Sequence, residues 1–510
     1  MKNNYYNELM VLDIANNHFG DVKHAKKIVD KFSKIIKKYK LNATFKFQFR
    51  DLDTFIHKDS KESGEKYVKR FMSTKLSLNQ FSEINSYIKK KKIKTACTPF
   101  DENSIANIEK LKFDYLKIAS VSALDFNIHE RAIKNKIPKI ISTGGLKIED
   151  IDKIVSFYIK KKQKFALMHC ISIYPSANRD LHISFIKNLK KRYKDIAIGW
   201  STHESPNELN PAVLAYACGA KIFEKHIGIE SNKYGLNNYS ITPEKFEKWY
   251  QNFNDCKEIL GKSSKIILKK ELSTLKKLER GVYAKSNIDK GEKLTKHNTY
   301  FAFPLKKNQL TASEFKRDIK ILSNTKEDKI ISRKNVKFDR NERKTQLIYS
   351  YIHKLKAMLN YNNINISENV KLELSHHKGV ENFQKTGCFL FNIINEEYAK
   401  KILVMLPNQR HPSHHHKIKK ESFIITAGSL KLNYNGKNFN LLPGEIFHIN
   451  KKSWHKFKAG SKGCIFEEIS TTSFKTDSYY KNTKIKSLTR NKRKTFINNW
   501  FTISNIISNN

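Results

Sequence analysis

Long apolar runs, cysteine pairs and acidic residues are scarce in this sequence. No stretch of the 510 residues approaches the roughly 20 consecutive apolar residues of a membrane-spanning helix. The first twenty residues also lack the apolar run of a signal peptide. The six cysteines are scattered and form no CxxC pair, which is typical of reduced thiols. We therefore expect a cytoplasmic protein without a membrane partner.

The shortage of acidic residues leaves 97 lysines and arginines against 49 aspartates and glutamates, a net charge of +48. Clustered basic charge is typical of nucleic-acid binding. Here the lysines are spread along the chain, and neither an aromatic-interleaved RNA motif nor a zinc-finger spacing occurs. We therefore attribute the charge to compositional bias and expect no nucleic-acid partner. The one concentrated basic run predicts a solvated tail over residues 476–510.

Hydrophobic residues nonetheless make up 39% of the chain, which is enough for packed cores. Eight short β-rich runs recur in the first 230 residues, each followed by a helix-like stretch. They span residues 10–16, 45–49, 94–100, 115–120, 138–144, 165–170, 196–202 and 220–226. Eight alternating units in roughly 250 residues predict an α/β fold of the TIM (β/α)8 barrel type. A doubly wound sheet is the alternative, but no GxGxxG loop supports it.

Each run begins with apolar residues and ends in polar ones, and the carboxyl ends of the strands carry the active site of a TIM barrel. His203 and His226 end the last two runs, so their imidazoles can meet and hold a catalytic divalent cation. Cations and hydroxyls at the other strand ends suit a phosphate or carboxylate. These residues are Lys46, Thr98, Lys117, Ser120, Ser142 and Ser201.

Eight sequence blocks resemble the sialic acid synthase family, which includes N-acetylneuraminate, legionaminate and pseudaminate synthases. The blocks are DIANNHFGD (13–21), FKFQ (45–48), CTPFDE (97–102), LKIAS (116–120), ISTGG (141–145), HCISIYP (169–175), GWSTHE (199–204) and EKHIG (224–228). Their order and spacing match over about residues 8–255. The resemblance implies a barrel that condenses phosphoenolpyruvate with an N-acyl amino-hexose, with Mn²⁺ or Mg²⁺ as cofactor.

The resemblance also implies a role for individual residues. His203 and His226 match the metal ligands, and Lys46 and Lys117 match cations of the phosphoenolpyruvate site. Further positions of that site are Thr98, Ser120, Ser142, Ser172 and Ser201, and the sugar-contacting positions are Gln48 and Tyr174.

The chain departs from the family pattern mainly at the sugar end. Asp13, Ser122 and Asn237 stand where the family has Glu, Glu and Asp. Ser172 replaces an Asn of the phosphoenolpyruvate site, and Phe303 stands where an Arg contacts the sugar's N-acyl group. Because both metal-ligand positions are kept, these departures predict a changed acceptor sugar rather than a lost activity.

Two further regions follow the barrel. Residues 279–305 resemble the antifreeze-like (SAF) domain of this family, a small β fold that reaches the neighbouring barrel of a homodimer. Residues 395–470 resemble a β jelly-roll cupin. Its HxH motif places His414 and His416 on one face of a strand. Glu421 and His455 complete a three-histidine, one-carboxylate set for a second divalent metal.

These assignments divide the chain into a synthase barrel (1–262), an SAF-like domain (263–338), a cupin domain (339–475) and the basic tail (476–510). We expect a synthase that makes a sialic-acid-like nonulosonic sugar acid. Two alternatives stay open: another phosphoenolpyruvate-dependent aldol synthase, and a catalytically retired protein that binds sugars or regulates. The role of the cupin also stays open between catalysis, binding and structure.

Overall fold

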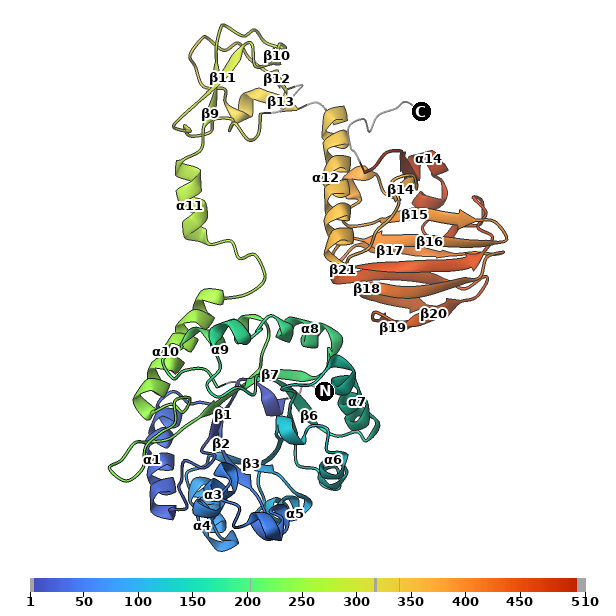
Figure 1. The fold of residues 1–510 in the computed structure, drawn as a ribbon. Helices are drawn as coiled ribbons and strands as arrows, with labels where there is room; N and C mark the ends of the chain where they lie inside the picture. The colour runs from blue at the N-terminus through green and yellow to red at the C-terminus, as the bar shows by residue number, and fades with distance from the viewer. Residues whose placement is uncertain (1–3, 202, 316–318, 339, 502–510) are drawn as a thin grey trace. The chain divides into compact units, whose positions relative to one another are not determined.

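The computed structural model describes residues 4–201, 203–315, 319–338 and 340–501, so Thr202 of the seventh strand-end block lies outside it. The chain forms two compact units that meet in sequence between Lys265 and Ile266 (Figure 1). Within the described residues, no helix is both long enough and apolar enough to cross a membrane.

The first unit is a closed barrel of eight parallel strands that follow one another in sequence order around the ring. The strands are β1 (Leu9–Asp13), β2 (Ala43–Phe49), β3 (Lys94–Pro99), β4 (Tyr115–Ile118), β5 (Lys139–Ser142), β6 (Phe165–Cys170), β7 (Ala197–Ser201) and β8 (Ile222–His226). β1 pairs with β8 as well as with β2, which closes the ring. This topology confirms the predicted TIM barrel.

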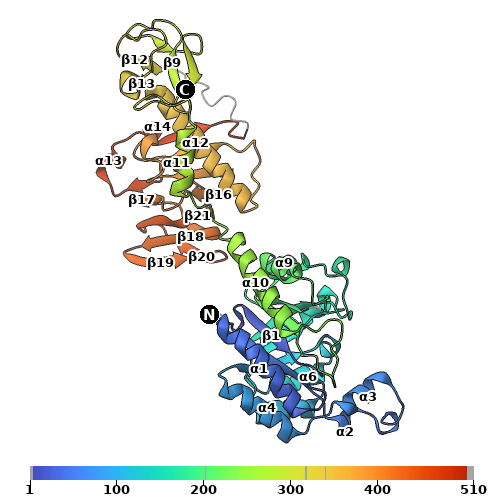
Figure 2. The same ribbon diagram turned by 90° about the vertical axis from the view of Figure 1, so that its left-hand side faces the viewer.

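Helices surround the barrel, as Figure 1 shows in a view along its axis. They are α1 (Val22–Lys38), α4 (Leu78–Lys90), α5 (Glu102–Lys110), α6 (Phe126–Ala132), α7 (Ile148–Lys160), α8 (Phe185–Arg192), α9 (Asn210–Ala217) and α10 (Pro243–Leu260). The apolar spacing of the first helix buries Ala25, Ile28 and Phe32 against the strands. The short helices α2 (Leu52–Phe55) and α3 (Lys66–Ser73) follow β2 and stand out from the barrel (Figure 2).

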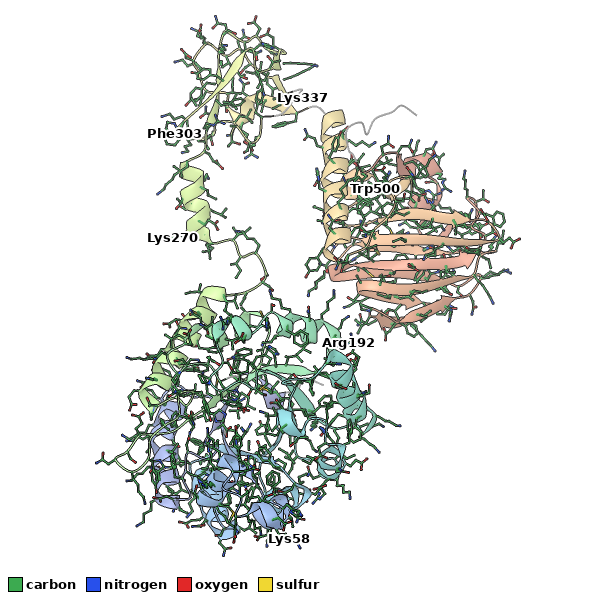
Figure 3. The ribbon with its side chains drawn as sticks, viewed as in Figure 1. Lys58, Arg192, Lys270, Phe303, Lys337 and Trp500 are labelled. Atoms are coloured by element: carbon green, nitrogen blue, oxygen red, sulfur yellow. The ribbon has the colours of Figure 1, made fainter. Side chains whose placement is uncertain are left out.

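The second unit begins with the exposed helix α11 (Lys269–Lys277) and a small antiparallel β region. Its strands are β9 (Gly281–Ala284), β10 (Lys293–Leu294), β11 (Thr299–Ala302), β12 (Ile319–Ile321) and β13 (Val336–Phe338). The region has its own apolar core, which includes Val282, Leu294 and Ile319. Phe303 is largely exposed at its surface (Figure 3).

A larger antiparallel sheet follows helix α12 (Arg340–Tyr361). Its strands are β14 (Leu372–Ser375), β15 (Cys388–Asn395), β16 (Tyr398–Met405), β17 (Arg410–His415), β18 (Glu421–Tyr434), β19 (Lys437–Leu441), β20 (Ile446–Ile449), β21 (His455–Thr471), β22 (Tyr479–Tyr480) and β23 (Lys494–Ile497). The longest strands, β18 and β21, pair along most of their length. This arrangement fits the predicted jelly roll.

The segment predicted to be a solvated tail is instead part of this sheet. β22 pairs with β17, and β23 pairs with β14. Short helices α13 (Thr483–Lys486) and α14 (Arg490–Arg493) lie between them. The prediction weighed only the basic residues, whereas Ile497 and Trp500 are buried and the Trp500 ring lies 5.0 Å from that of Phe391 (Figure 3). Burial of these apolar side chains holds the basic segment on the sheet.

Candidate active site

A cavity of about 780 Å³ opens at the carboxyl ends of the barrel strands. Every barrel residue that the sequence predicted for the site lines it, except one. The lining residues are Asp13, Lys46, Gln48, Thr98, Lys117, Ser120, Ser142, Ser172, Tyr174, Ser201, His203, His226 and Asn237. Ser122 does not line the cavity, because it is buried in the 3-10 turn Ser120–Ser122.

A chain of buried charges forms the floor of the cavity. Lys46 Nζ lies 2.7 Å from Asp13 Oδ2 and 3.5 Å from Glu224 Oε1. Lys117 Nζ lies 2.6 Å from Glu224 Oε2. Burial opposes both charged states, but the partners prevail: Asp13 and Glu224 raise the pKa of Lys46, and Lys117 and Lys46 lower that of Glu224 to about 2. The charged forms of Lys46 and Glu224 therefore persist at neutral pH.

The sequence analysis gave Glu224, which begins the EKHIG block, no role in the site. It stands two positions before His226 on β8, so the two side chains point to the same side of the strand. That alternation is the signal that could have identified it. Lys225, between them, points the other way and pairs with Glu204 at 2.7 Å.

The two imidazoles lie together above this floor, with ring centroids 5.2 Å apart. His203 Nδ1 donates to the carbonyl of Ile171 at 2.9 Å, which leaves the lone pair of Nε2 free. His226 Nδ1 is buried without a hydrogen bond among the described residues, although Asp13 Oδ2 is 3.4 Å away. Burial and His226 lower the pKa of His203 to about 3, and burial lowers that of His226. Two neutral imidazoles with free nitrogens fit a divalent cation.

Two serine hydroxyls meet at Gly144, just past the end of β5. Ser120 Oγ accepts a hydrogen bond from the Gly144 amide at 3.1 Å. A Cβ atom at this glycine would lie 2.7 Å from Ser120 Oγ and 2.7 Å from Ser172 Oγ. Only glycine therefore leaves room at this position for both hydroxyls.

Arg50 is a second lining residue that the sequence analysis missed. Its guanidinium lies between the rings of Phe71 and Phe100, 4.0 Å and 3.7 Å from their centroids. Arg50 Nη2 donates to Gln48 Oε1 at 3.1 Å. Burial lowers the pKa of Arg50 to about 10, so it remains a cation. Because Gln48 and Arg50 are two residues apart where β2 ends, strand alternation again predicts a shared direction.

The sugar-side residues surround the histidines. The ring of Tyr174 lies 3.9 Å from that of His203. Asn237 Oδ1 accepts from the amides of Tyr239 and Ser240, at 3.2 Å and 2.9 Å. Asn237 therefore shapes its own loop, and the ring of Tyr239 packs edge-on against His226.

The jelly roll holds a separate group of imidazoles. The ligand nitrogens of His414, His416 and His455 all lie within 4.8 Å of one another. Each Nδ1 bonds a backbone carbonyl, of Pro412, Asp477 and Ser453 respectively. With Nδ1 as the donor, every Nε2 carries a lone pair, and Nε2 of His414 and Nε2 of His455 lie 3.0 Å apart. Burial lowers the pKa of all three histidines.

Glu421, the fourth predicted ligand, stands beside this group. Its carboxylate oxygens lie 3.4 Å from His416 Nε2 and 3.4 Å from His455 Nε2. Lys419 also pairs with Glu421, and Glu421 Oε2 has no hydrogen-bond partner within the described part of the chain. Three neutral imidazoles and a carboxylate fit a divalent first-row metal.

The sequence matches two family models. Residues 36–265 match the NeuB family, and residues 401–467 match the cupin domain. Most of the barrel falls within the first matched region. His414, His416 and His455 fall within the second.

Known proteins resemble the chain over the barrel and the region after it. An uncharacterized protein of Methanocaldococcus jannaschii is 32% identical over 317 residues, covering 62% of this chain and 90% of that protein. The N,N'-diacetyllegionaminic acid synthase of Campylobacter jejuni is 24% identical, covering 63% of this chain and 98% of the synthase.

A solved structure gives the same result. Spore coat polysaccharide biosynthesis protein E of Chromobacterium violaceum is 36% identical, with a TM-score of 0.61. The match covers 65% of this chain and 99% of that one. The chain therefore belongs to the NeuB family of sialic-acid-type synthases and carries a cupin domain later in the sequence than the barrel of that family.

Proposed function

We propose that the barrel condenses phosphoenolpyruvate with an N-acyl amino-hexose to give a nonulosonic sugar acid and phosphate. The observation that carries this proposal is the convergence of strand-end residues on one cavity, with lysines, hydroxyls and two neutral imidazoles together. C3 of phosphoenolpyruvate would bond to the aldehyde carbon of the sugar, whose oxygen gains a proton. Water would then add at C2. The C2–O bond to the phosphate would break, so inorganic phosphate would leave with the bridging oxygen while the added hydroxyl loses its proton and becomes the C2 carbonyl.

The cavity suits the charge of phosphoenolpyruvate. Lys46 and Lys117 are already paired with Asp13 and Glu224, so they alone do not neutralise an added phosphate and carboxylate. Arg50, Lys66 and Arg70 line the same cavity, and among the described residues no carboxylate pairs with them. They would supply the remaining positive charge, while the hydroxyls at Gly144 would orient one anionic group.

His203 and His226 would hold the divalent cation of the barrel. When bound, such a cation supplies Lewis-acid polarisation of the acceptor's carbonyl oxygen. Glu224 keeps its negative charge at the cavity floor, because its pKa is lowered to about 2 by Lys117 and Lys46. A fixed carboxylate there would stabilise positive charge that develops at C2 during the reaction.

The acceptor would differ from N-acetylmannosamine. Asp13 turns its carboxylate to Lys46, Ser122 is outside the cavity lining, and Asn237 holds its own loop. None of the three therefore offers the free carboxylate that the family pattern places at the sugar. Arg50 donates to Gln48 Oε1 and so fixes the orientation of the Gln48 amide. That amide would in turn orient an amide or hydroxyl group of the sugar.

Two finer parts of the proposal concern the rest of the chain. We propose a homodimer in which the SAF-like domain reaches the partner's barrel, where Phe303 would take the place of the family's arginine. We also propose that His414, His416, Glu421 and His455 hold a second divalent metal.

The deciding test is phosphate release from phosphoenolpyruvate over a panel of sugars with Mn²⁺. Release with amino-hexoses is the expected result. Release only with phosphorylated aldoses would instead favour the alternative aldol synthase. No release, and no binding of phosphoenolpyruvate by calorimetry with metal present, would indicate a retired barrel.

A further inference from the structure

The jelly roll encloses a cavity of about 460 Å³, within the size range of small-molecule sites. One side is formed by the inner faces of the sheet and includes His414, His416 and Glu421. The other side comes from residues 473–496, the basic segment that folds back onto the sheet. This cupin cavity, as we call it, is therefore completed by a part of the chain beyond residues 401–467, which match the cupin domain.

Positive charge exceeds negative charge among the residues that line the cupin cavity. Six lysines and arginines line it against three glutamates. The cations are Lys401, Lys419, Lys475, Arg490, Arg493 and Lys494.

The glutamates are shared between these cations. Glu468 accepts from both Lys401 and Lys419, at 2.8 Å and 2.7 Å. Glu373 likewise faces both Arg490 and Lys494. Since the histidines are neutral, the cavity retains positive charge even before a metal binds, and an anionic ligand would relieve it.

Arg493 is the cation best placed to meet an anion. Within the described residues no carboxylate pairs with it, and its buried Nε lacks a hydrogen-bond partner. Its guanidinium lies 4.9 Å from the ring centroid of Tyr480, whose ring lies 5.6 Å from that of His414. A buried guanidinium N–H without an acceptor is costly, and a planar carboxylate would satisfy it.

The uncharged lining of the cupin cavity suits a sugar rather than a bare anion. Side-chain amides and hydroxyls can bond sugar hydroxyls, and aromatic rings can cover the apolar faces of a sugar ring. The polar residues are Ser375, Asn392, Asn395, Ser473, Ser478 and Asn491. The rings are Phe423, Phe457, Phe474, Tyr480 and Phe496.

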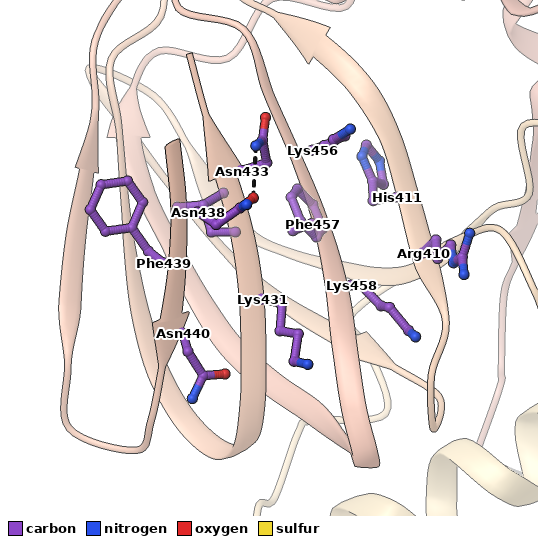
Figure 4. Close-up of a pocket in the computed structure, with 11 residues that line it drawn as sticks. Arg410, His411, Lys431, Asn433, Asn438, Phe439, Asn440, Lys456, Phe457 and Lys458 are labelled. Carbon is purple, nitrogen blue, oxygen red and sulfur yellow. Dashed lines mark hydrogen bonds between the residues drawn. The ribbon is translucent and has the colours of Figure 1, made fainter. Parts of the chain in front are cut away.

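A groove on the opposite face of the same sheet shows that positive charge alone is not distinctive in this lysine-rich chain (Figure 4). Lys431 and Lys458 lie opposite each other there, as do Asn433 and Lys456 in the register of β18 and β21. No carboxylate is among the described residues that line this groove. Lys458 lines this groove and not the cupin cavity, so it provides a control.

We propose that the cupin cavity binds a small acidic sugar, whose carboxylate meets Arg493. The identification of that acid with the product class of the barrel rests on the proposed function, whereas the site itself rests only on the jelly roll. Binding of its own product class would make the second unit a store or sensor for what the barrel releases.

The test is calorimetric titration of the full metal-loaded chain with N-acetylneuraminic acid, its methyl ester and N-acetylmannosamine. A Lys46→Ala background weakens binding at the barrel's phosphoenolpyruvate site, so that heat from the cupin cavity can be distinguished. The acid should bind, and the two uncharged sugars should bind at least tenfold more weakly. Arg493→Ala should weaken binding of the acid at least tenfold, whereas Lys458→Ala should change it less than twofold.

A second measurement uses the wild-type protein and does not depend on the folding of a variant. N-acetylneuraminic acid should protect the peptide that contains Arg493 from modification by phenylglyoxal. Equal binding of acid and ester, displacement by an equal concentration of inorganic phosphate, or absence of protection would each overturn the proposal. Failure of the barrel's proposed function would show in the phosphate-release assay and leave this titration interpretable.

Discussion

The barrel cavity and the cupin cavity both contain a buried glutamate that lies between two lysines, although their folds differ. In the barrel, Glu224 lies between Lys46 and Lys117, and in the jelly roll Glu468 lies between Lys401 and Lys419. In both, burial raises the pKa of the glutamate, but the two flanking lysines together outweigh it and lower the pKa. Imidazoles stand beside each pair of lysines.

The two cavities differ in where their residues come from. Each barrel strand contributes from its carboxyl end, so neighbouring strands bring the site together by topology alone. The cupin cavity instead depends on a segment that returns after the jelly-roll motifs have ended. The barrel fold itself therefore sets the positions of the barrel-site residues. In the cupin cavity, many of the lining residues come instead from residues 473–496, which lie outside the jelly-roll motifs.

The largest effect should follow from removing either barrel imidazole. We expect His203→Ala and His226→Ala each to reduce turnover on the order of 10³-fold or more, because a metal's stabilisation of developing charge amounts to several kcal/mol. Phosphate release measures turnover, and far-UV circular dichroism checks the fold. The exposed His182→Ala serves as control. Full activity in either variant, or in chelated enzyme, would show that the barrel works without this metal.

The acceptor preference should produce the next largest effect. Losing one charged hydrogen bond to a substrate costs roughly 1.5–3 kcal/mol, so several altered positions should make N-acetylmannosamine worse by about 10³-fold. We expect a 2,4-diacetamido-trideoxyhexose to have the higher kcat/KM under identical metal and phosphoenolpyruvate. A preference for N-acetylmannosamine would mean that the departures at Asp13, Ser122, Asn237 and Phe303 are neutral.

Removing one lysine from the lysine–glutamate–lysine group of each cavity tests whether the two groups stabilise the fold in the same way. Lys46→Ala should raise the KM for phosphoenolpyruvate by about 10²-fold or abolish activity, since a charged contact is lost. It should also destabilise the barrel by about 3–5 kcal/mol, because Asp13 and Glu224 stay buried without that partner.

Lys419→Ala should destabilise the jelly roll similarly, because it removes the lysine that pairs with Glu421 and one of the two lysines that pair with Glu468. Denaturant titration of both variants measures the free energies of unfolding. Loss of stability in only one of them would break the parallel between the cavities.

A smaller effect should follow from filling the space at Gly144. Gly144→Ala places a Cβ against Ser120 and Ser172, so we expect kcat/KM for phosphoenolpyruvate to fall by about 10-fold, as displaced hydrogen bonds cost about 1 kcal/mol each. The matched control is Gly235→Ala, where an added Cβ would have no atom within 4 Å. If the two substitutions have equal effects, the hydroxyls of Ser120 and Ser172 do not contribute to phosphoenolpyruvate binding.

The smallest effect concerns acid. Burial lowers the pKa of His18 in the barrel to about 4, below its ordinary value of 6.5. The unfolded chain therefore takes up a proton that the folded chain does not, and stability should fall as pH drops from 6.5 towards 4. His18→Asn retains an acceptor for the Gly20 amide and should lose less of its melting temperature between pH 7 and 4.5. If His18→Asn loses as much melting temperature as the wild type between pH 7 and 4.5, groups other than His18 cause the loss of stability in acid.

Sequence analysis predicted the barrel and most of its site because the carboxyl end of each strand can be identified from the sequence alone. His203 and His226 needed only the order of β7 and β8. Glu224 and Arg50 were given no role because strand alternation, which relates them to His226 and Gln48, was not applied to them. Ser122 was misplaced because the 3-10 turn after β4 rotates it away from the cavity, which no residue pattern in that block indicates.

The jelly roll was harder to predict completely. The spacing of His414, His416, Glu421 and His455 identified the cluster, since a period of two places alternate residues on one face. Arg493 could not be assigned in this way. Its position depends on the return of β23 to β14, a pairing between segments about 120 residues apart that is set by burial of Ile497 and Trp500.

The pairing of β23 with β14 also covers an edge of the sheet. β23 satisfies the backbone N–H and C=O groups of β14, from Leu372 to Ser375, that would otherwise be free. A chain shortened at residue 476 would present an open strand, flanked by the uncovered ring of Phe391, to other molecules. Such a truncation is thus expected to cause self-association, so the basic segment also acts as a safeguard against aggregation.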